Sequence, residues 1–596
     1  MNKINTISSL HLYTAFMAGG EAIIKQKNYL NKINVFPVPD ADTGTNMAST
    51  MRSIMENSKI YASIKETMNS IADSALTGAR GNSGIIFAQF IHGVRQEIED
   101  SERLTLHSFS YALKKAVHYL YDSVMEPIDG TIITVIEDWI ASVIHHGNSA
   151  DDFSEVLNKS YSVAEQSLLD TPKKMELLAK NNVVDAGAQG FVHFLEGVLS
   201  QIKKGKFVRQ APRSDFTDVI RNQHTFKKED VIEYRYCTEA ILSEAVKELT
   251  DIKALISKYG NSAIVAGSKS KIHFHVHTNS PGELFQEIKD FGTISRIKVD
   301  DMQKQYEMAH NKKYPIALVT DSAADLPGEL IEKYQIQQIP FKISFGDNMF
   351  LDKLTLTPEN FYKMLVESDE MPRSSQPDYQ QIKNLYDQLT TQYDQIIATH
   401  ISSKLTGIYA SSMKIRKDYK DSHIHIIDTK QLSASEGLIT MRIAEAIAAG
   451  MAYEEIIEQS EAWVKNSRIL TDIDSLKYMV KGGRVSPLTG FIAKMINLKP
   501  IVTVDESGKG KAFGKSFSRK ANMKKIINLM MEEIKGKALW NYAIVHSQSL
   551  TRAEEYAEKL TKLTGQKPAY IIDISPVVGV HNGIGSVAVT YMYDEK

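Results

Sequence analysis

Residues 34–47 read NVFPVPDADTGTNM, a proline-stiffened approach followed by a tight turn. Asp40 and Asp42 are two residues apart, so both carboxylates can turn toward one point. Mg²⁺ takes oxygen ligands of this kind and keeps positions open for substrate phosphates. A helix predicted over Asn46–Ser58 would begin beside them, and the free N–H groups at a helix start favour anions. The stretch therefore predicts a site for a polyphosphate and its metal ion.

Two other interpretations compete with this one on spacing alone. An ordinary solvated turn would carry the same residues, because short motifs often match by chance. A calcium-binding EF-hand loop fits poorly, because Gly44 and Met51 would stand where calcium needs oxygen side chains. On the spacing of the two aspartates alone, the ordinary solvated turn is the favoured interpretation.

The whole string from Asn34 to Met47 resembles the nucleotide-binding domain of the DAK2 family, the ATP-binding half of dihydroxyacetone kinases and bacterial fatty acid kinases. The resemblance implies that Asp40 and Asp42 bind two Mg²⁺ ions that hold the phosphates of ATP. It also implies nucleotide contacts from the residues that follow, Thr43, Thr45 and Asn46. A third aspartate of the dihydroxyacetone kinase pattern is missing here, because Asn34 or Val35 takes its place.

Length and composition set the broad class of protein. The 596 residues suggest about three or four domains, and a net charge of −2 gives no reason to expect nucleic acid as a partner. Cys237 is the single cysteine, which excludes an intrachain disulfide framework and fits a reducing cytoplasm. We find no signal-peptide pattern and no apolar run of roughly 18–20 residues, so we expect a cytoplasmic protein without a transmembrane segment.

The N-terminal region, 1–202, is predicted to be an all-helical domain. Leu104–Met125 and Asp152–Leu168 carry apolar residues at three- and four-residue spacing, and strand-like runs are scarce. The segment 203–228 follows as a basic linker, and its Lys and Arg residues indicate a solvated connector. A docking strip for a partner domain is the alternative interpretation of this linker.

Three short loops in the helical domain precede predicted helices: Gly78–Gly84, Asp129–Thr131 and Asp185–Gly190. Glycines let backbone N–H groups approach an anion, but helix capping is the better explanation of each loop when it is taken alone. Together they match the DAK2 pattern, in which such loops surround the nucleotide. The resemblance implies phosphate contacts from Asn82, Ser83 and Gly84 and nearby polar contacts from Thr131 and Asp185.

The middle region, 229–310, shows strand and helix patterns in the order βαββαβ, which predicts a small α+β, ferredoxin-like domain. Because side chains alternate along a strand, residues 271–278 place Ile272, Phe274 and Val276 on a core face. The opposite face, which we predict to be exposed, carries His273, His275 and His277.

Cys237 lies on a neighbouring predicted strand, and zinc accepts both thiolate and imidazole ligands. A hydrated histidine face beside an inert thiol is the alternative. The pattern resembles the middle domain of the kinase component of bacterial fatty acid kinases, and this resemblance implies that Cys237, His275 and His277 bind zinc. His273 is a lesser candidate for a fourth ligand.

The third region, 314–596, alternates strands and helices and is predicted to be an α/β domain, with its ligand site at polar strand ends. Ser374–Pro377 and Ser402–Gly407 supply hydroxyls that suit a carboxylate head group, or that simply cap helices. Residues 508–516 imitate a Walker A loop, but the spacing between their glycines is wrong, so we do not place ATP there.

This region resembles the DegV family, a fold that binds fatty acids, through Thr320–Ser322, the two hydroxyl loops and the strings at 476–486 and 579–581. The resemblance implies a fatty acid carboxylate held by Ser374, Ser375 and Thr406. Arg484 and His581 match basic residues near the head group and are the candidate catalytic residues. Ser374 replaces the usual threonine, Thr406 replaces the usual serine, and Ile584 replaces a proline of the family pattern.

These resemblances imply an ATP-dependent fatty acid kinase that makes acyl-phosphate, with Mg²⁺ and zinc as cofactors. The fatty acid is held by the chain's own third domain or delivered by a separate carrier protein, and an acyltransferase is a further candidate partner. Resemblance also suggests a homodimer, and transient membrane contact is compatible with a lipid substrate. A kinase of a small hydroxyketone such as dihydroxyacetone, or a non-catalytic lipid-binding protein, is the alternative.

Overall fold

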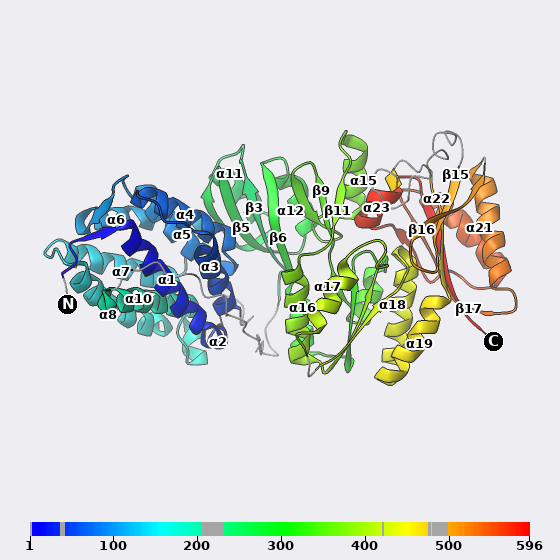
Figure 1. The fold of residues 1–596 in the computed structure, drawn as a ribbon, viewed down its shortest axis with the longest axis horizontal. Coiled ribbons are helices and arrows are strands. Elements are labelled where there is room, and N and C mark those ends of the chain that lie inside the picture. The colour runs from blue at the N-terminus through cyan, green and yellow to red at the C-terminus, as the bar shows by residue number, and fades with distance from the viewer. Residues whose placement is uncertain are drawn as a thin grey trace. The chain divides into compact units, whose positions relative to one another are not determined.

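The computed structural model describes residues 3–35, 42–205, 207, 232–419, 422–474, 478–479, 499–516 and 518–595. Asp40 and Arg484, both predicted to be functional, lie outside these residues, as does most of the basic linker. The chain divides into two compact units, Met1–His310 and Asn311–Lys596, and each is described by itself (Figure 1). None of the described helices is long and apolar enough to cross a membrane.

The first part of unit 1 is helical, as predicted, apart from a small ribbon in which β1 (Thr6–Ser8) pairs with β2 (Arg103–Thr105). Its helices are α1 (Ser9–Lys25), α2 (Lys27–Lys32), α3 (Thr43–Asn57), α4 (Ile64–Gly78), α5 (Gly81–Glu97), α6 (Leu106–Ser123), α7 (Ile132–Gly147), α8 (Phe153–Lys174), α9 (Glu176–Asn181) and α10 (Ala186–Lys204). Helix α5 is apolar on nearly all sides and is buried along most of its length. Phe87 on this helix contacts Phe191 and Phe194 of α10 edge-on, with ring centroids 6.0 and 5.1 Å apart.

The second part of unit 1 has the predicted βαββαβ order, followed by one more helix. Its elements are β3 (Tyr236–Ser243), α11 (Leu249–Ser257), β4 (Gly260–Ser268), β5 (Lys271–Thr278), α12 (Pro281–Ile288), β6 (Thr293–Asp301) and α13 (Met302–His310). The strands form an antiparallel sheet in the order β4-β5-β3-β6. Phe274 packs on Phe285 of α12 with ring centroids 6.1 Å apart, so the predicted core face is confirmed.

The predicted exposure of the histidine face is wrong. His273, His275 and His277 are only 0, 2 and 6% exposed, because this face of the sheet packs on α4 and α5 of the helical domain. The contact is polar as well as apolar. The His273 Nδ1 is 2.9 Å from the carbonyl oxygen of Leu76, and the Gly267 N–H donates to Gln89 Oε1 at 2.8 Å.

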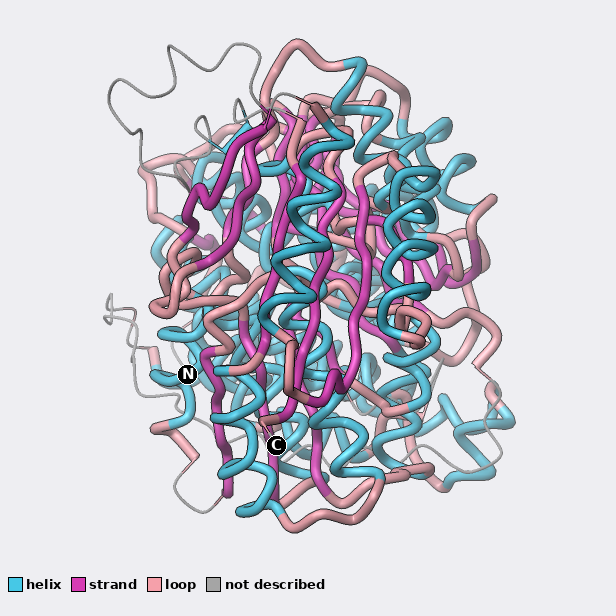
Figure 2. Tube along the Cα trace, turned by 90° about the vertical axis from the view of Figure 1, so that its right-hand side faces the viewer, coloured by secondary structure: helices cyan, strands magenta, loops and turns pink. Residues whose placement is uncertain are grey.

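Unit 2 is α/β, as predicted. Its elements are β7 (Ile316–Asp321), α14 (Gly328–Lys333), β8 (Gln337–Ile339), β9 (Lys342–Phe345), β10 (Asn348–Leu351), α15 (Pro358–Glu367), β11 (Arg373–Ser375), α16 (Tyr379–Gln392), β12 (Gln395–His400), α17 (Ile408–Arg416), β13 (His423–Asp428), α18 (Ser433–Ala448), α19 (Tyr453–Lys465), β14 (Ser467–Asp472), β15 (Lys499–Val504), β16 (Gly510–Ser516), α21 (Arg519–Glu533), β17 (Ala538–His546), α22 (Leu550–Thr564), β18 (Ile571–Asp573), α23 (Pro576–Asn582) and β19 (Val587–Asp594). Figure 2 shows helices lying over the strands and running roughly alongside them.

The described strands of unit 2 form separate sheets. A parallel sheet has the order β13-β12-β7-β8, a mixed sheet has the order β16-β15-β14-β19-β17-β18, and β9 pairs with β10 and β11. Helices α21 and α22 bury Met523, Ile526 and Leu560 against the mixed sheet. Strand β16 pairs antiparallel with β15, so the false Walker A string is part of a strand pair and is not a phosphate-binding loop.

Candidate functional site

Several helix N-termini converge within the helical domain. Asp185 caps α10 by accepting a hydrogen bond from the Ala188 N–H at 2.8 Å, and it also accepts one from the backbone of Ile132 at the start of α7. Burial raises the pKa of Asp185 to about 6, although these hydrogen bonds act in the opposite direction. The side chain of Ser83, near the start of α5, lies against Gly187, in the first turn of α10. The starts of α5, α7 and α10 are therefore neighbours.

The start of α3 joins the same group. Gly81 has a φ of +57°, and the Asn46 side chain fills the space that a Cβ at this position would need. Asp42 precedes α3 without a side-chain capping bond, so capping does not occupy its carboxylate. The Asn82 Oδ1 is buried and has no hydrogen-bond partner. The structure thus brings together the described residues predicted to bind nucleotide, around helix starts whose first N–H groups lack intrahelical partners.

Some of the threonines predicted to bind nucleotide already donate their hydroxyl protons within the protein. The Thr43 hydroxyl donates to Asn34 Oδ1 at 2.8 Å, and the Thr131 hydroxyl donates to the Ile128 carbonyl oxygen at 2.8 Å. The Thr45 hydroxyl instead accepts from Asn31 Nδ2 at 2.9 Å, so its own proton can still be donated. Of these three threonines, Thr45 therefore has the hydroxyl best prepared to donate to an anion.

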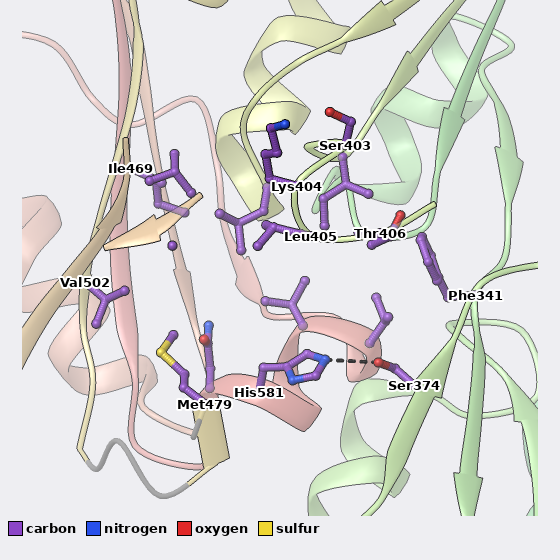
Figure 3. Close-up of a pocket in the computed structure, with 18 of the residues that line it drawn as sticks. Phe341, Ser374, Ser403, Lys404, Leu405, Thr406, Ile469, Met479, Val502 and His581 are labelled. Atoms are coloured by element: carbon purple, nitrogen blue, oxygen red, sulfur yellow. Dashed lines mark hydrogen bonds between the residues drawn. The ribbon is translucent and has the colours of Figure 1, made fainter. Parts of the chain in front are cut away.

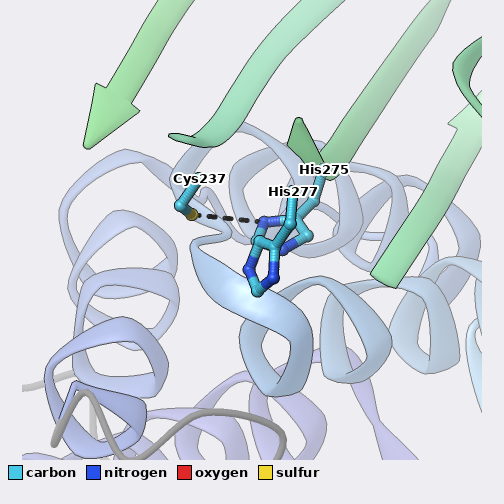
Figure 4. A group of neighbouring side chains, drawn as sticks. All are labelled: Cys237, His275 and His277. Carbon is cyan, nitrogen blue, oxygen red and sulfur yellow. Dashed lines mark hydrogen bonds between the residues drawn. The ribbon is translucent and has the colours of Figure 1, made fainter. Parts of the chain in front are cut away.

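A second cluster lies on the sheet of unit 1. Cys237 on β3 is directly opposite His277 on β5, and His275 is two residues away on the same face (Figure 4). The three donor groups are buried, and their ligand atoms lie within 4.8 Å of one another, so this cluster could hold a metal ion. His275 directs Nδ1 toward Cys237 Sγ at 3.8 Å, whereas its Nε2 is buried without a hydrogen-bond partner.

The protonation of this cluster suits a cation. Burial lowers the pKa of His277 to about 3, so its imidazole is neutral and can act as a ligand. Burial also raises the pKa of the Cys237 thiol well above its usual value. A bound dication would supply the positive charge that a buried thiolate needs. His273 is not part of the cluster, and its Nδ1 faces the carbonyl oxygen of Leu76.

The sequence interpretation missed Glu239. This side chain is fully buried on β3, and its Oε1 is 2.6 Å from the Gly81 nitrogen and 3.2 Å from His275 Nδ1. Burial would raise the pKa of the carboxyl, but Lys298, His275 and Arg80 together hold it well below its usual range. Side-chain alternation along the strand was an available signal, because it puts Glu239 on the same face as Cys237.

Unit 2 contains a cavity of about 560 Å³ (Figure 3). Hydroxyl and imidazole groups from three different segments gather on one part of its wall: Ser374 on β11, Thr406 before α17, and His581 on α23. Ser374 Oγ is 3.0 Å from His581 Nε2. The Thr406 hydroxyl accepts from the Ile408 N–H at 3.2 Å, so its own proton is free to be donated into the cavity.

The rest of the cavity wall is largely apolar, and the residues that form it were not predicted from the sequence. Its apolar members include Phe341, Ile401, Leu405, Ile469, Met479 and Val502. Ser375, predicted to bind the fatty acid carboxylate, also lines the cavity. Asp321 instead supports the fold, because its Oδ2 accepts from the Ile401 N–H at 3.0 Å and faces His400 Nδ1 at 3.1 Å.

Three family models match successive regions of the chain, and these regions correspond to the three predicted from the sequence motifs. A DAK2 domain model matches residues 37–200, a FakA-like middle-domain model of the fatty acid kinases matches 233–309, and a model of the uncharacterised DegV family matches 315–594. One chain carries a DAK2 domain, a FakA-like middle domain and a DegV domain. The four helix starts thus belong to the DAK2 domain, the Cys/His cluster to the FakA-like domain and the cavity to the DegV domain.

Several relatives are uncharacterised staphylococcal proteins. One from Staphylococcus epidermidis is 29% identical over 56% of this chain and 64% of its own length. One from Staphylococcus aureus is 30% identical over 50% of this chain and 56% of its own length. The chain thus matches less than two thirds of these two proteins. A protein of Staphylococcus haemolyticus is 26% identical over 80% of this chain and 88% of its own length.

Solved DegV structures are similar to part of this chain. DegV of Bacillus subtilis, described as a fatty acid binding protein, is 27% identical, with a TM-score of 0.44, over 47% of this chain and 100% of that one. A fatty acid binding DegV family protein of Streptococcus agalactiae is 24% identical, with a TM-score of 0.44, over 47% of this chain and 99% of its own.

Proposed function

We propose that this protein is an ATP-dependent kinase that phosphorylates the carboxylate of a fatty acid held in its DegV domain. The observation that carries the proposal is the cavity of unit 2, in which a largely apolar wall bears a group of hydroxyl and imidazole side chains. Its volume of about 560 Å³ is within the usual range for small-molecule sites. The DAK2 domain and the FakA-like domain, both of kinase type, supply the phosphotransferase part of the proposal.

The polar wall of the cavity has the donors that a carboxylate head group needs. Ser374 can accept a hydrogen from His581 Nε2 and donate its own hydroxyl proton to one carboxylate oxygen. Thr406, whose oxygen is already bonded to the Ile408 N–H, can donate to the other. The apolar remainder of the wall would hold the acyl tail. A lipid bound by the chain itself is therefore favoured over delivery by a separate carrier.

The reaction would join one carboxylate oxygen to the γ-phosphorus of ATP and break the bond between that phosphorus and the β–γ bridging oxygen, releasing ADP. The carboxylate is already a nucleophile and needs little general-base help. Bound Mg²⁺, held by Asp42 and Asp40, would neutralise charge on the β- and γ-phosphates. Asp42 fits this role, because capping does not occupy its carboxylate. The N–H groups of α5 that follow Gly81 and the Thr45 hydroxyl would hold phosphate oxygens.

Lipid extraction and a turnover assay test the proposal together. Mass spectrometry of an organic extract of the purified protein should find a fatty acid, and ATP consumption should require added fatty acid. Hydroxylamine should trap the acyl-phosphate product as a hydroxamate. If no acyl chain is extracted and fatty acid does not stimulate ATP consumption, the proposal fails. Turnover with dihydroxyacetone instead would identify a hydroxyketone kinase, and bound lipid without turnover would identify a binding protein.

We also propose that Cys237, His275 and His277 bind zinc, because zinc takes one sulfur and two imidazole ligands and leaves a fourth position open. Purified protein should contain about one zinc ion per chain by elemental analysis. His275→Ala should lose the ion. His273→Gln should retain it, because His273 is on the same strand but outside the cluster. Zinc-free wild-type protein, or equal zinc loss in both variants, would contradict the assignment.

A further inference from the structure

Glu239 joins two sites that belong to different domains of unit 1. One of its oxygens, Oε1, is 2.6 Å from the Gly81 nitrogen, in the first turn of α5, and 3.2 Å from His275 Nδ1, in the Cys/His cluster. Its side chain is fully buried, and the Arg80 guanidinium is 3.7 Å from Oε2. A single carboxylate oxygen therefore faces both the predicted phosphate-binding turn and the predicted metal centre.

The hydrogen-bond chemistry links the state of one site to the geometry of the other. Nδ1 of His275 is the ring nitrogen that faces both Glu239 Oε1 and, at 3.8 Å, Cys237 Sγ. An ion held jointly by Cys237 and this histidine would therefore lie close to Glu239 and would fix the imidazole against it. Carboxylates beside a ligating histidine orient the ligand in many proteins.

The turn at Gly81, on the other side of Glu239, is tightly packed. Gly81 has a φ of +57° and packs against the Asn46 side chain, so the turn has little room to shift. The Gly81 N–H is used by Glu239, and the next N–H groups along the first turn of α5 remain for an anion. Any movement of Glu239 would displace Asn82 and Ser83, the two residues that follow Gly81.

We propose that Glu239 is a positioning residue through which metal occupancy of the Cys/His cluster strengthens nucleotide binding at the start of α5. The inference rests on the proposed ATP and metal sites and adds a coupling between them. By reciprocity, nucleotide should tighten metal binding by the same factor that metal tightens nucleotide binding. Glu239 needs no contact with either ligand for this role.

The test compares zinc-loaded and zinc-stripped full-length protein in binding a non-hydrolysable ATP analogue with Mg²⁺, measured by calorimetry. In the wild type, zinc should tighten analogue binding by roughly 5- to 150-fold, the usual span of coupling between two sites. In Glu239→Gln this ratio should fall toward one. The zinc affinity of Glu239→Gln, measured against a chromogenic chelator, should be about 10- to 100-fold weaker than that of the wild type. If Glu239→Gln does not fold, Glu239→Asp, which keeps the charge and shortens the reach, gives the same comparison.

Gln89→Met is the matched control. Gln89 makes a comparable bond between the same two domains, to the Gly267 N–H at 2.8 Å, without touching the turn or the cluster. It should leave the zinc-dependent ratio unchanged, which separates coupling from general stability. A wild-type ratio of one, an unchanged ratio in Glu239→Gln, or an equal fall in Gln89→Met would overturn the inference. Wild-type protein that binds no analogue in either zinc state would instead count against the proposed kinase function.

Discussion

Asp42→Asn should lower the kcat/KM for fatty-acid-dependent ATP consumption by about 100- to 1,000-fold. The substitution removes a negatively charged oxygen ligand, and metal-assisted charge stabilisation in phosphoryl transfer is worth several kcal/mol, at about 1.4 kcal/mol per factor of ten. The structure supports this target, because capping does not occupy the Asp42 side chain. The measurement is steady-state turnover at saturating fatty acid with ATP and Mg²⁺ varied together.

Asp73→Asn provides the control for this variant. Asp73 is exposed on α4 of the same helical domain, so its substitution removes one negative charge and should keep wild-type turnover. Fatty acid binding should be unchanged in both variants, because the cavity belongs to the other unit. An Asp42→Asn protein with turnover within a few-fold of the wild type would show that this carboxylate does not hold the catalytic metal.

Thr406→Val should weaken fatty acid binding by about 10- to 100-fold. The change keeps the shape of the side chain and removes a hydroxyl whose proton is free to bond to the carboxylate. A hydrogen bond to a charged group contributes about 1.5–3 kcal/mol, which corresponds to the expected loss in affinity. Displacement of a fluorescent fatty acid from purified protein measures the effect directly.

Thr471→Val is the matched control in the same cavity. Thr471 lines the cavity from β14, close to Ile469, and we expect it to lie beside the acyl tail, away from the carboxylate. Its substitution should change affinity by less than a few-fold. Equal losses in the two valine variants would mean that Thr406 has no special relation to the carboxylate, and an unaltered Thr406→Val affinity would refute the assigned head-group position.

Much of the fold followed from local patterns. Alternation predicted the strand over Lys271–Thr278, and β5 has the same bounds. The βαββαβ order predicted for residues 229–310 is also observed. The apolar run over residues 335–345 forms two strands, β8 and β9, divided at Pro340, whose ring nitrogen has no hydrogen to donate to a ladder.

The candidate sites were harder to predict, because they depend on contacts between distant segments. The exposure of the histidine face was mispredicted because the surface that covers it includes Leu76 and Gln89, nearly 200 residues earlier in the chain. The partner of Glu239, the N–H of Gly81, is 158 residues away. A pattern within one strand gives the side of the strand on which a residue lies, but it does not show what covers that side. The cavity wall was missed for the same reason, since its apolar residues come from many elements.

The buried position of the Cys/His cluster also bears on how the protein matures. Its donor groups lie between a sheet and the helices that cover it, so an ion reaches them more readily before these two surfaces meet. Loading would then be a step of biosynthesis, completed as the newly made polypeptide assembles, and the finished molecule would exchange its ion slowly with the surrounding solution. Scarcity of the metal during growth would accordingly leave ion-free molecules that take up zinc slowly when it is supplied later.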